Sequence, residues 1–419
     1  MNLKINDMET TKFAQQRNPV FDYIKTYISY VMELRFNTVK QLLEYRKINE
    51  ENFENFTDKV VNSLYIQMKS ENTFKFTKSD LDVFLNSEEI PYYNPYKAYF
   101  ESLPEWDGVD YIKQLSEYIQ VEEAKGYYFF VQLKKWLVRA IKCALEPKYF
   151  NKQMLVFVGE QQNTGKTTFC RWLCPPLLQS YYTEEVAQGK DEYMQLSSNF
   201  FVVYDELVKL NKAGLEDIKA LFTKNSIKYR PPYAKIEQEY FRTCSFIGNT
   251  NQTQFLTDET GSIRFLSFLL KSINFDYSKN CDINKIYAQA YYLYKYNNDY
   301  EMTKEEQNAL QEYNKKFFVI STEYDFILEY LRKPTKEDYS VNSTTLIYQW
   351  SAGQILQFLQ DCNTNIKLNA IMLGKSLKFL GFEKRAIRFQ NSKLYAYELC
   401  LNNPYMFVRE NLKHCFLKK

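Results

Sequence analysis

The segment from Met154 to Thr168 constrains the fold more than any other part of this sequence. It begins with MLVFVG, a compact apolar run ending in glycine, and continues with a polar loop before Lys and Thr at a predicted helix start. Such an apolar run is typical of a buried parallel strand. A strand, a loop whose backbone N–H groups wrap phosphates, a Lys and then Thr are the parts of a P-loop. The segment therefore predicts an α/β fold with a parallel sheet and a nucleotide site.

The loop residues define the expected ATP contacts. Lys166 is expected to reach the β- and γ-phosphates, and Thr167 to coordinate Mg²⁺. The usual spacing puts the first glycine where Glu160 stands, whereas Gly159 comes one residue earlier. A chance Gly-Lys-Thr is the alternative, and the strand before it and the helix after it argue against chance. The full predicted ATP-binding set is Gly159, Asn163, Thr164, Gly165, Lys166, Thr167 and Thr168.

A second apolar run, FFVVYDE, ends in two adjacent carboxylates. We expect Asp205 to join the Mg²⁺ shell and Glu206 to polarise the attacking water, because one carboxylate can bind metal while its neighbour acts as a base. An ordinary strand that ends in a solvated acidic pair is the alternative. The position of the pair, one helix and loop after the P-loop, favours the catalytic interpretation.

A third apolar run, CSFIGNTN, ends in two amides. An amide there, Asn249 or Asn251, can hold the lytic water near the γ-phosphate without adding charge. Asparagine at a strand end is also a routine turn former. The ordered set of three strand ends, rather than either amide alone, predicts a catalytic site.

A single arginine precedes the next apolar run, in FLTDETGSIRF. Arg264 is expected to donate to the γ-phosphate across a subunit boundary, where it would stabilise transition-state charge. The alternative is a surface arginine paired with Asp258 or Glu259.

These segments together resemble the virulence-associated protein E family, a superfamily 3-like AAA+ helicase group of phages and integrated mobile elements. The resemblance covers about residues 20–315 and rests on NPYKAYFESLPEWDGVDYI, GEQQNTGKTTFCRWL, YDELVKLNKAGLEDIKALFTKNSIKYRPPYAK, RTCSFIGNTNQTQFLTDETGSIRF and IYAQAYYLYKYNN. It implies a homo-oligomeric ring, a hexamer, that hydrolyses ATP while moving along single-stranded or forked DNA during replication of a mobile element.

The resemblance also implies roles for single residues. Lys166, Thr167, Asp205, Glu206 and Asn251 match the family's nucleotide, metal, acidic and sensor positions. Arg264 stands where relatives often carry two adjacent arginines, and here an isoleucine precedes it. Many relatives also carry a primase domain in front of the ATPase. The N-terminal region here lacks the expected strand and acidic-triad pattern, so we do not predict priming.

The segment SIKYRPPYAKIEQEYFRT predicts a β-hairpin that turns at two prolines. In superfamily 3 rings a hairpin before the sensor strand points into the pore. Tyr229 or Tyr233 is expected to stack on a base, and three cations are expected to follow DNA phosphates: Lys228, Arg230 and Lys235. A solvated basic hairpin is the alternative.

Periodicity divides the chain into three predicted parts. These are a mainly helical N-terminal region over 1–125, the P-loop ATPase domain over 126–315, and a small C-terminal domain over 316–419. The last part shows helix, helix, strand, strand, which is the order of a winged helix. Its segment KSLKFLGFEKR offers Lys375, Lys378, Lys384 and Arg385, either to DNA or to a protein partner.

Composition limits the remaining partners. The net charge is +3, so any nucleic-acid surface is a local basic patch. Eight cysteines without a CxxC pair, and His414 as the one histidine, argue against a zinc site. No apolar run reaches the length of a membrane span, and the N-terminus lacks the apolar core of a signal peptide. We therefore expect a cytoplasmic protein without a membrane partner.

Three functions fit these motifs. The first is a replicative DNA helicase or initiator, and the second is a P-loop switch or sensor in anti-phage defence that does not unwind DNA. The third is a DNA-binding regulator with a decayed P-loop, and the intact Lys166, Thr167, Asp205 and Glu206 argue against it. The first two share every motif.

Overall fold

The structure is a computed structural model that forms two compact units. It describes residues 18–71, 73–122, 126–161, 163–186, 189–207, 220–222, 224, 226–230, 236–256, 262–297, 299–340, 343, 345–362, 365–389, 392–403 and 416–417. The first unit consists of Met1–Thr253 with Ile263–Leu310, and the second of Gln254–Ser262 with Gln311–Lys419. No helix among the described residues is both long enough and apolar enough to cross a membrane.

The first unit begins with helices around a small sheet. Helix α2 (Pro19–Val31) leads into the antiparallel hairpin β1 (Met32–Asn37) and β2 (Leu42–Lys47). The sheet order is β3-β2-β1-β4, with β3 at Glu54–Asn55 and β4 at Tyr92–Tyr93. Helix α2 ends at Val31, because Met32 already pairs with Lys47 in the hairpin.

Two further helices complete this N-terminal part, α3 (Asp58–Glu71) and α4 (Lys78–Leu85). Thr77 caps α4 in a reciprocal capping box with Asp80. The helices share a core with α2 and the hairpin, formed by Ile24, Ile28, Met32, Leu64, Met68, Phe76, Leu81, Phe84, Leu85 and Ile90.

The next helices belong to the core of the central sheet. They are α5 (Pro95–Ser102), α6 (Tyr111–Glu117) and the long α7 (Gly126–Leu145), with the short strand β5 (Ile119–Val121) between α6 and α7. Fully buried side chains of α5 and α6 lie in the same hydrophobic cluster as the sheet strands. The core that carries the P-loop therefore starts near residue 95, and not at the predicted boundary of 125.

The central sheet has six strands in the order β5-β12-β6-β11-β8-β7. The bounds of the strands after β5 are β6 (Met154–Val158), β7 (Tyr182–Thr183), β8 (Phe201–Tyr204), β11 (Ser245–Thr250) and β12 (Phe265–Ile273). All neighbours are parallel except β5, which pairs antiparallel with β12. Every residue of β6, β8 and β11 is buried, as the apolar runs predicted.

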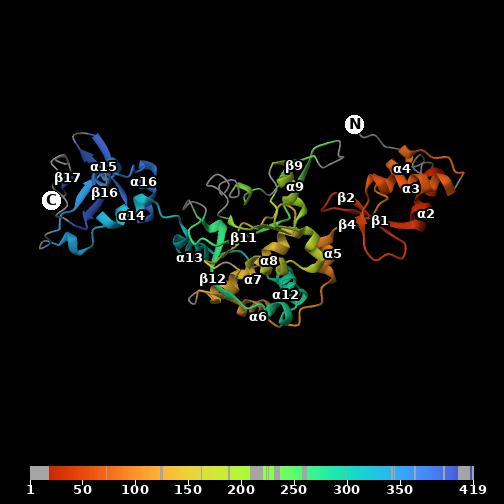
Figure 1. Cartoon of the computed structure of the whole chain (residues 1–419), viewed down its shortest axis with the longest axis horizontal. Helices are drawn as coiled ribbons and strands as arrows, with labels where there is room; N and C mark the ends of the chain where they lie inside the picture. Colours follow the sequence, from red (N-terminus) through yellow and green to blue (C-terminus); the bar gives the residue numbers. More distant parts are fainter. Residues whose placement is uncertain are drawn as a thin grey trace, which may run out of the picture. The chain divides into compact units, whose positions relative to one another are not determined.

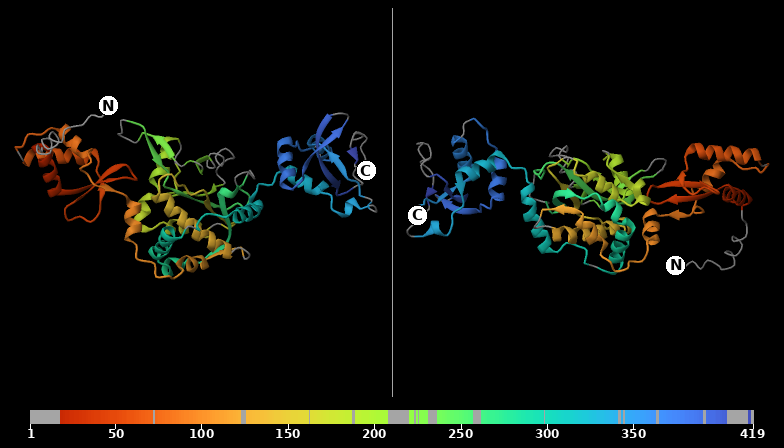
Figure 2. Two further views of the ribbon diagram at one scale, coloured as in Figure 1. Left: turned by 180° about the vertical axis from the view of Figure 1, so that it is seen from behind. Right: turned by 60° about the horizontal axis from the view of Figure 1, so that its bottom comes forward.

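Helices cover one face of this sheet, as Figures 1 and 2 show. From α7, Phe129 contacts Phe157 of β6, and Trp136 contacts Phe201 of β8. Helix α8 (Lys166–Leu173) places Phe169 against Phe157 on the same face. Helices α7 and α8 therefore pack on the same face of the sheet, and α7 contacts both β6 and β8.

Shorter elements connect these strands and helices. Their bounds are η2 (Pro176–Tyr181), α9 (Lys190–Ser198), β9 (Ser226–Tyr229), β10 (Gln238–Phe241), η4 (Ser262–Arg264), α11 (Tyr277–Asn280), α12 (Ile283–Tyr296) and α13 (Lys304–Asn314). On the second face of the sheet, Phe222 contacts Phe246 of β11 and Phe265 of β12.

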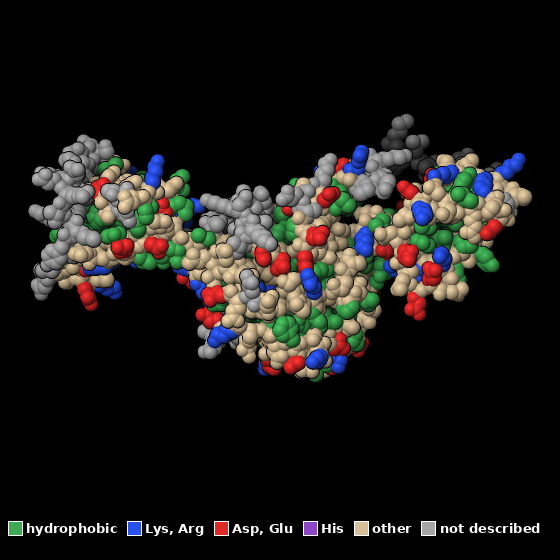
Figure 3. All heavy atoms as spheres, viewed as in Figure 1, with side chains coloured by type: hydrophobic (Ala, Val, Ile, Leu, Met, Phe, Trp, Pro, Cys, Tyr) green, Lys and Arg blue, Asp and Glu red, His purple; other side chains and the backbone are tan. Residues whose placement is uncertain are grey.

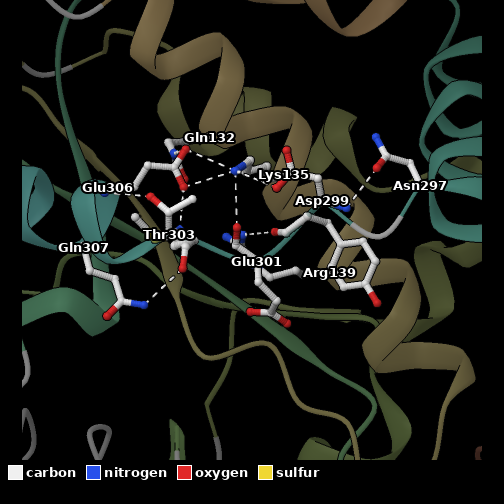
Figure 4. Close-up of polar contacts among 11 residues, drawn as sticks. Gln132, Lys135, Arg139, Asn297, Asp299, Glu301, Thr303, Glu306 and Gln307 are labelled. Carbon is white, nitrogen blue, oxygen red and sulfur yellow. Dashed lines mark hydrogen bonds and ion pairs between the residues drawn. The ribbon is translucent and has the colours of Figure 1, made fainter.

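A polar network ties α7 to the first turn of α13, and Figure 4 shows it around Lys135. The Lys135 Nζ atom lies 3.1 Å from both carboxylate oxygens of Glu306 and 3.6 Å from Asp299. Gln132 also donates to Glu306, at 2.9 Å. Within this network the buried Gln132 Oε1 has no hydrogen-bond partner among the described residues. No group of three His, Cys, Asp or Glu that could hold a metal ion occurs in the described part of the chain. The contacts join the two helices.

The second unit has its own hydrophobic core. Its elements are η5 (Lys315–Phe317), α14 (Thr322–Tyr330), β13 (Leu331–Arg332), η6 (Glu337–Tyr339), β14 (Tyr348–Trp350), α15 (Ala352–Cys362), α16 (Ala370–Phe379), β15 (Lys384–Phe389), β16 (Ser392–Leu401) and β17 (Phe416–Leu417). Strands β15 and β14 both pair antiparallel with β16. The predicted order of helix, helix, strand, strand is present, and its assignment as a winged helix stays a prediction.

Candidate nucleotide site

The carboxyl ends of three parallel strands meet at one cavity. Strand β11 lies between the P-loop strand β6 and the acidic strand β8, so all three strands end at the same edge of the sheet. The cavity there has a volume of about 480 Å³ and is lined by Asn163, Thr164, Gly165, Lys166, Thr167, Thr168, Asp205, Glu206, Asn249, Thr250, Asn251 and Phe275. Crevices outside the carboxyl ends of strands are where open α/β sheets bind ligands.

The loop after β6 has the backbone that a phosphate cradle requires. Asn163 and Gly165 both adopt positive φ angles, +60° and +85°. Helix α8 then begins at Lys166, and no side chain caps its first turn. The first N–H groups of a helix have no partner within the helix, so they can bind an anion. Gly159, which does not line the cavity, fixes the loop to the neighbouring strand through its N–H bond to the Thr250 carbonyl, at 3.0 Å.

Lys166 is held at the centre of this loop. Its Nζ atom donates to Asn251 Oδ1 at 2.7 Å and to Thr164 Oγ1 at 3.0 Å. The loop carbonyls of Gly159 and Gln161 accept at 3.4 and 3.3 Å. Burial lowers the pKa of the Lys166 ammonium, and the nearby Asp205 carboxylate opposes that shift. The Lys166 ammonium is therefore held in place by the loop and by Asn251, the residue that follows β11.

Asp205 and Thr167 lie close enough to share one metal ion. The Thr167 hydroxyl donates to Asp205 Oδ1 at 3.2 Å, and the Asn249 amide donates to the same oxygen at 3.3 Å. Mg²⁺ prefers oxygen ligands, keeps several waters and needs few carboxylates from the protein. A hydroxyl and a carboxylate brought together at a phosphate loop fit that ion.

Glu206 lines the same cavity, in the turn that directly follows β8. Its φ angle is +56°, in the left-handed region that non-glycine residues seldom adopt. Such backbone strain gathers at functional sites. The turn keeps both carboxylates at the cavity, where a continued strand would send them to opposite faces.

Both amides of the third strand line the cavity. Asn251 contacts Lys166, as described above, whereas Asn249 is almost fully buried and contacts Asp205. The Cys170 thiol of α8 also lies 3.5 Å from Asn249 Oδ1. Asn249 lies within β11, whereas Asn251 directly follows the last residue of the strand, Thr250.

Arg264 lies at the amino-terminal ends of the parallel strands, whereas the cavity lies at their carboxyl ends. It immediately precedes β12, whose first residue Phe265 pairs with Met154 at the start of β6. The five residues of β6 correspond to roughly 17 Å of strand. Arg264 is half-buried and is not among the described residues that line the cavity. Arg264 is therefore separated from the cavity of its own chain by about the length of strand β6.

The predicted hairpin is present as β9 and β10, and it projects from the first unit in Figures 1 and 2. Lys228 and Arg230 are exposed on it. Lys235 and Tyr233 lie outside the described residues. Tyr229 is buried, contacts the Tyr240 ring at 4.5 Å and shares a hydrogen bond of 3.0 Å with the Ser197 hydroxyl, so its ring packs inside the unit and base stacking stays a prediction for Tyr233.

Surface charge is mixed around this hairpin. Glu239 lies directly opposite Lys228 in the strand register and accepts a hydrogen bond from Ser226. On the face drawn in Figure 3, the basic and acidic side chains of the first unit are interspersed. A nucleic-acid contact here would therefore rest on a few exposed cations, in agreement with the small net charge.

One protein-family model and several solved structures are similar to this chain. The model of the virulence-associated protein E-like domain matches residues 100–319. An apo structure of the NrS-1 C-terminal region is 13% identical, with a TM-score of 0.51, and the match covers 91% of this chain and 99% of that one. A second form of the same region has a TM-score of 0.48 at 13% identity, covering 91% and 98%. An inhibitor-bound JCV helicase has a TM-score of 0.27 at 12% identity, covering 64% and 75%. No curated protein matches the sequence.

Proposed function

This chain belongs to the virulence-associated protein E-like family, and from that premise we propose that it is a Mg²⁺-dependent AAA+ ATPase acting on DNA. Its role would be that of a ring helicase or replication initiator of a phage or integrated mobile element. The cavity of about 480 Å³ carries the proposal, because a phosphate loop, a buried Lys, an acidic pair and two amides all line it. These groups serve phosphoryl transfer by positioning and charge stabilisation.

The chemistry follows from the contacts. Backbone N–H groups and Lys166 would neutralise the phosphates, and Thr167 with Asp205 would hold Mg²⁺. Glu206 would orient the attacking water and accept its proton. Asn251, now bonded to Lys166, would exchange that partner for the γ-phosphate or the water. The sensor strand would thereby report whether the γ-phosphate is present.

The Glu206→Gln variant tests this assignment. An amide cannot take the proton from water, so we expect hydrolysis to fall by about a hundredfold or more while ATP binding persists. Phosphate release and ATP affinity are measured with Mg²⁺ and again with EDTA, and EDTA should abolish turnover. Glu185→Gln, at an exposed position outside the cavity, is the control. A Glu206 variant with the parental rate would show that the acidic pair is misassigned.

The DNA part of the proposal rests on hairpin β9–β10. Both of its strands lie in the chain between β8, which ends at the acidic pair, and β11, which ends at the amides. A change of nucleotide state at those strand ends can therefore move the hairpin through its own backbone. Its exposed cations Lys228 and Arg230 suit phosphate contacts, which release counterions from the nucleic acid.

Lys228→Ala with Arg230→Ala should weaken single-strand binding. The slope of log affinity against log salt should fall by roughly 0.7 for each cation removed. ATP hydrolysis without DNA should persist, because neither residue lines the cavity, and its stimulation by DNA should fall. The matched control removes two exposed lysines of other elements, Lys47 and Lys97. An unchanged slope with full stimulation would make the hairpin an ordinary surface loop.

A further inference from the structure

An aromatic side chain lies at the nucleotide cavity without a role in the chemistry above. Phe275 is the one apolar residue among the described residues that line it, since the others are polar or glycine. It follows β12 in the chain, and about half of its surface, 51%, is exposed. A large apolar surface left open inside a polar site is available for a ligand to cover.

The ring of Phe275 covers the turn of the phosphate loop. A Cβ atom added at Gly165 would lie only 2.5 Å from the ring's Cζ and 2.6 Å from its Cε1. The ring edge therefore rests directly on the α-carbon side of Gly165, one residue before the cation Lys166. Two features favour glycine at position 165: its φ angle is +85°, and the Phe275 ring leaves no room for a Cβ atom.

The segment that carries Phe275 is anchored on both sides. Before it, the Asn274 N–H donates to the Tyr118 carbonyl at 2.9 Å. After it, the buried Tyr277 ring packs edge-on against Phe169 and Trp172 of α8, with centroids 5.3 and 4.8 Å apart. The P-loop helix itself therefore fixes the position of Phe275 relative to the phosphate loop.

We propose that the Phe275 ring stacks on the base of the bound nucleotide, an inference that rests on the proposed nucleotide-binding function. Phe275 lines the same cavity as residues 163–168, so a nucleotide whose phosphates bind that loop would meet this exposed ring as the one apolar surface among the described lining residues. A π-face accepts any base, and a purine offers it the larger surface. The site would thus take purine nucleoside phosphates, bound at one end by charge and at the other by stacking.

The test compares the binding affinities of ADP and inorganic pyrophosphate, both with Mg²⁺. Only ADP carries a base, and neither measurement depends on ATP hydrolysis. Stacking of one base corresponds to about a tenfold change in affinity. Phe275→Leu should therefore weaken ADP binding about tenfold and leave pyrophosphate binding unchanged. Phe275→Tyr, which keeps the ring, should bind both ligands like the parent. Calorimetry gives the affinities, and unchanged melting temperatures show that the variants fold.

The contrary outcomes separate this inference from the proposed function. Equal loss of ADP and pyrophosphate in Phe275→Leu would show that the ring only shapes the loop. Tighter ADP binding in that variant would show that the ring obstructs the nucleotide. An ADP affinity that is unchanged in Phe275→Leu would show that the base does not contact the Phe275 ring. In all three cases binding would still depend on Lys166, whereas a parent that binds neither ligand would overturn the proposed function itself.

Discussion

Lys166→Ala is expected to abolish ATP hydrolysis, with a loss of about a thousandfold or more. The ammonium of Lys166 lies inside the phosphate loop and is nearly buried, so no other cation among the residues lining the cavity can replace it. Removal of one charge-stabilising donor from a preorganised site costs rates of that order. The measurement is steady-state phosphate release together with ATP affinity.

Two companion variants make the Lys166 result specific. Lys166→Met keeps the aliphatic stem, so it preserves packing in the loop while it removes the charge. Lys152→Ala removes an exposed lysine just before the same strand, β6, and should keep full activity. If Lys166→Met hydrolysed ATP at the parental rate, the loop would not be the phosphate site.

Arg264→Ala is expected to lower hydrolysis by about a thousandfold, the lower end of what an arginine finger supplies. Arg264 lies at the amino-terminal end of β12, away from its own cavity, so in the proposed ring the arginine and the P-loop of one active site would belong to different subunits. Mixing Arg264→Ala with Lys166→Ala should therefore restore some activity, since mixed assemblies contain interfaces in which both residues are intact.

The control is a second mixture, in which the Lys166→Ala protein is combined with a double variant that carries both Lys166→Ala and Arg264→Ala. No site in this second mixture has an intact Lys166, so it should stay inactive. Co-assembly is shown by pull-down of an untagged variant with a tagged one. If the two variants of the first mixture co-assemble and the mixture stays inactive, Arg264 does not act on the nucleotide of a neighbouring subunit.

The central strands and their ends were predictable from sequence for a physical reason. Strands β6, β8 and β11 are buried on both faces. Strands β6 and β8 are therefore short apolar runs followed by conspicuous polar residues, whereas β11 has Phe246 and Ile247 followed by Gly, Asn and Thr. Since parallel strands end at the same edge, the Lys, the carboxylates and the amides had to converge. The cavity brings those predicted residues together, although their catalytic roles stay predictions.

Other features left no local signal. The two-residue strands β3, β4 and β7 are too short to show a periodicity, and they form only because neighbouring strands present free edges. Phe275 reaches Gly165 because Tyr277 is anchored on α8, which is a contact between segments far apart in sequence. The burial of Tyr229 likewise depends on Ser197 and Tyr240. Long-range packing decides such positions, and one sequence does not reveal it.

Strand displacement on forked DNA, with purified protein, ATP and Mg²⁺, tests the central proposal most directly. We expect the parent to release the labelled strand in an ATP-dependent reaction, and Lys166→Ala to release none while it still binds the fork. Substitution of Lys228 and Arg230 should reduce the release without changing DNA-independent hydrolysis. A parent that hydrolyses ATP but releases no strand, with a rate indifferent to DNA, would contradict the helicase account and favour a P-loop switch or sensor instead.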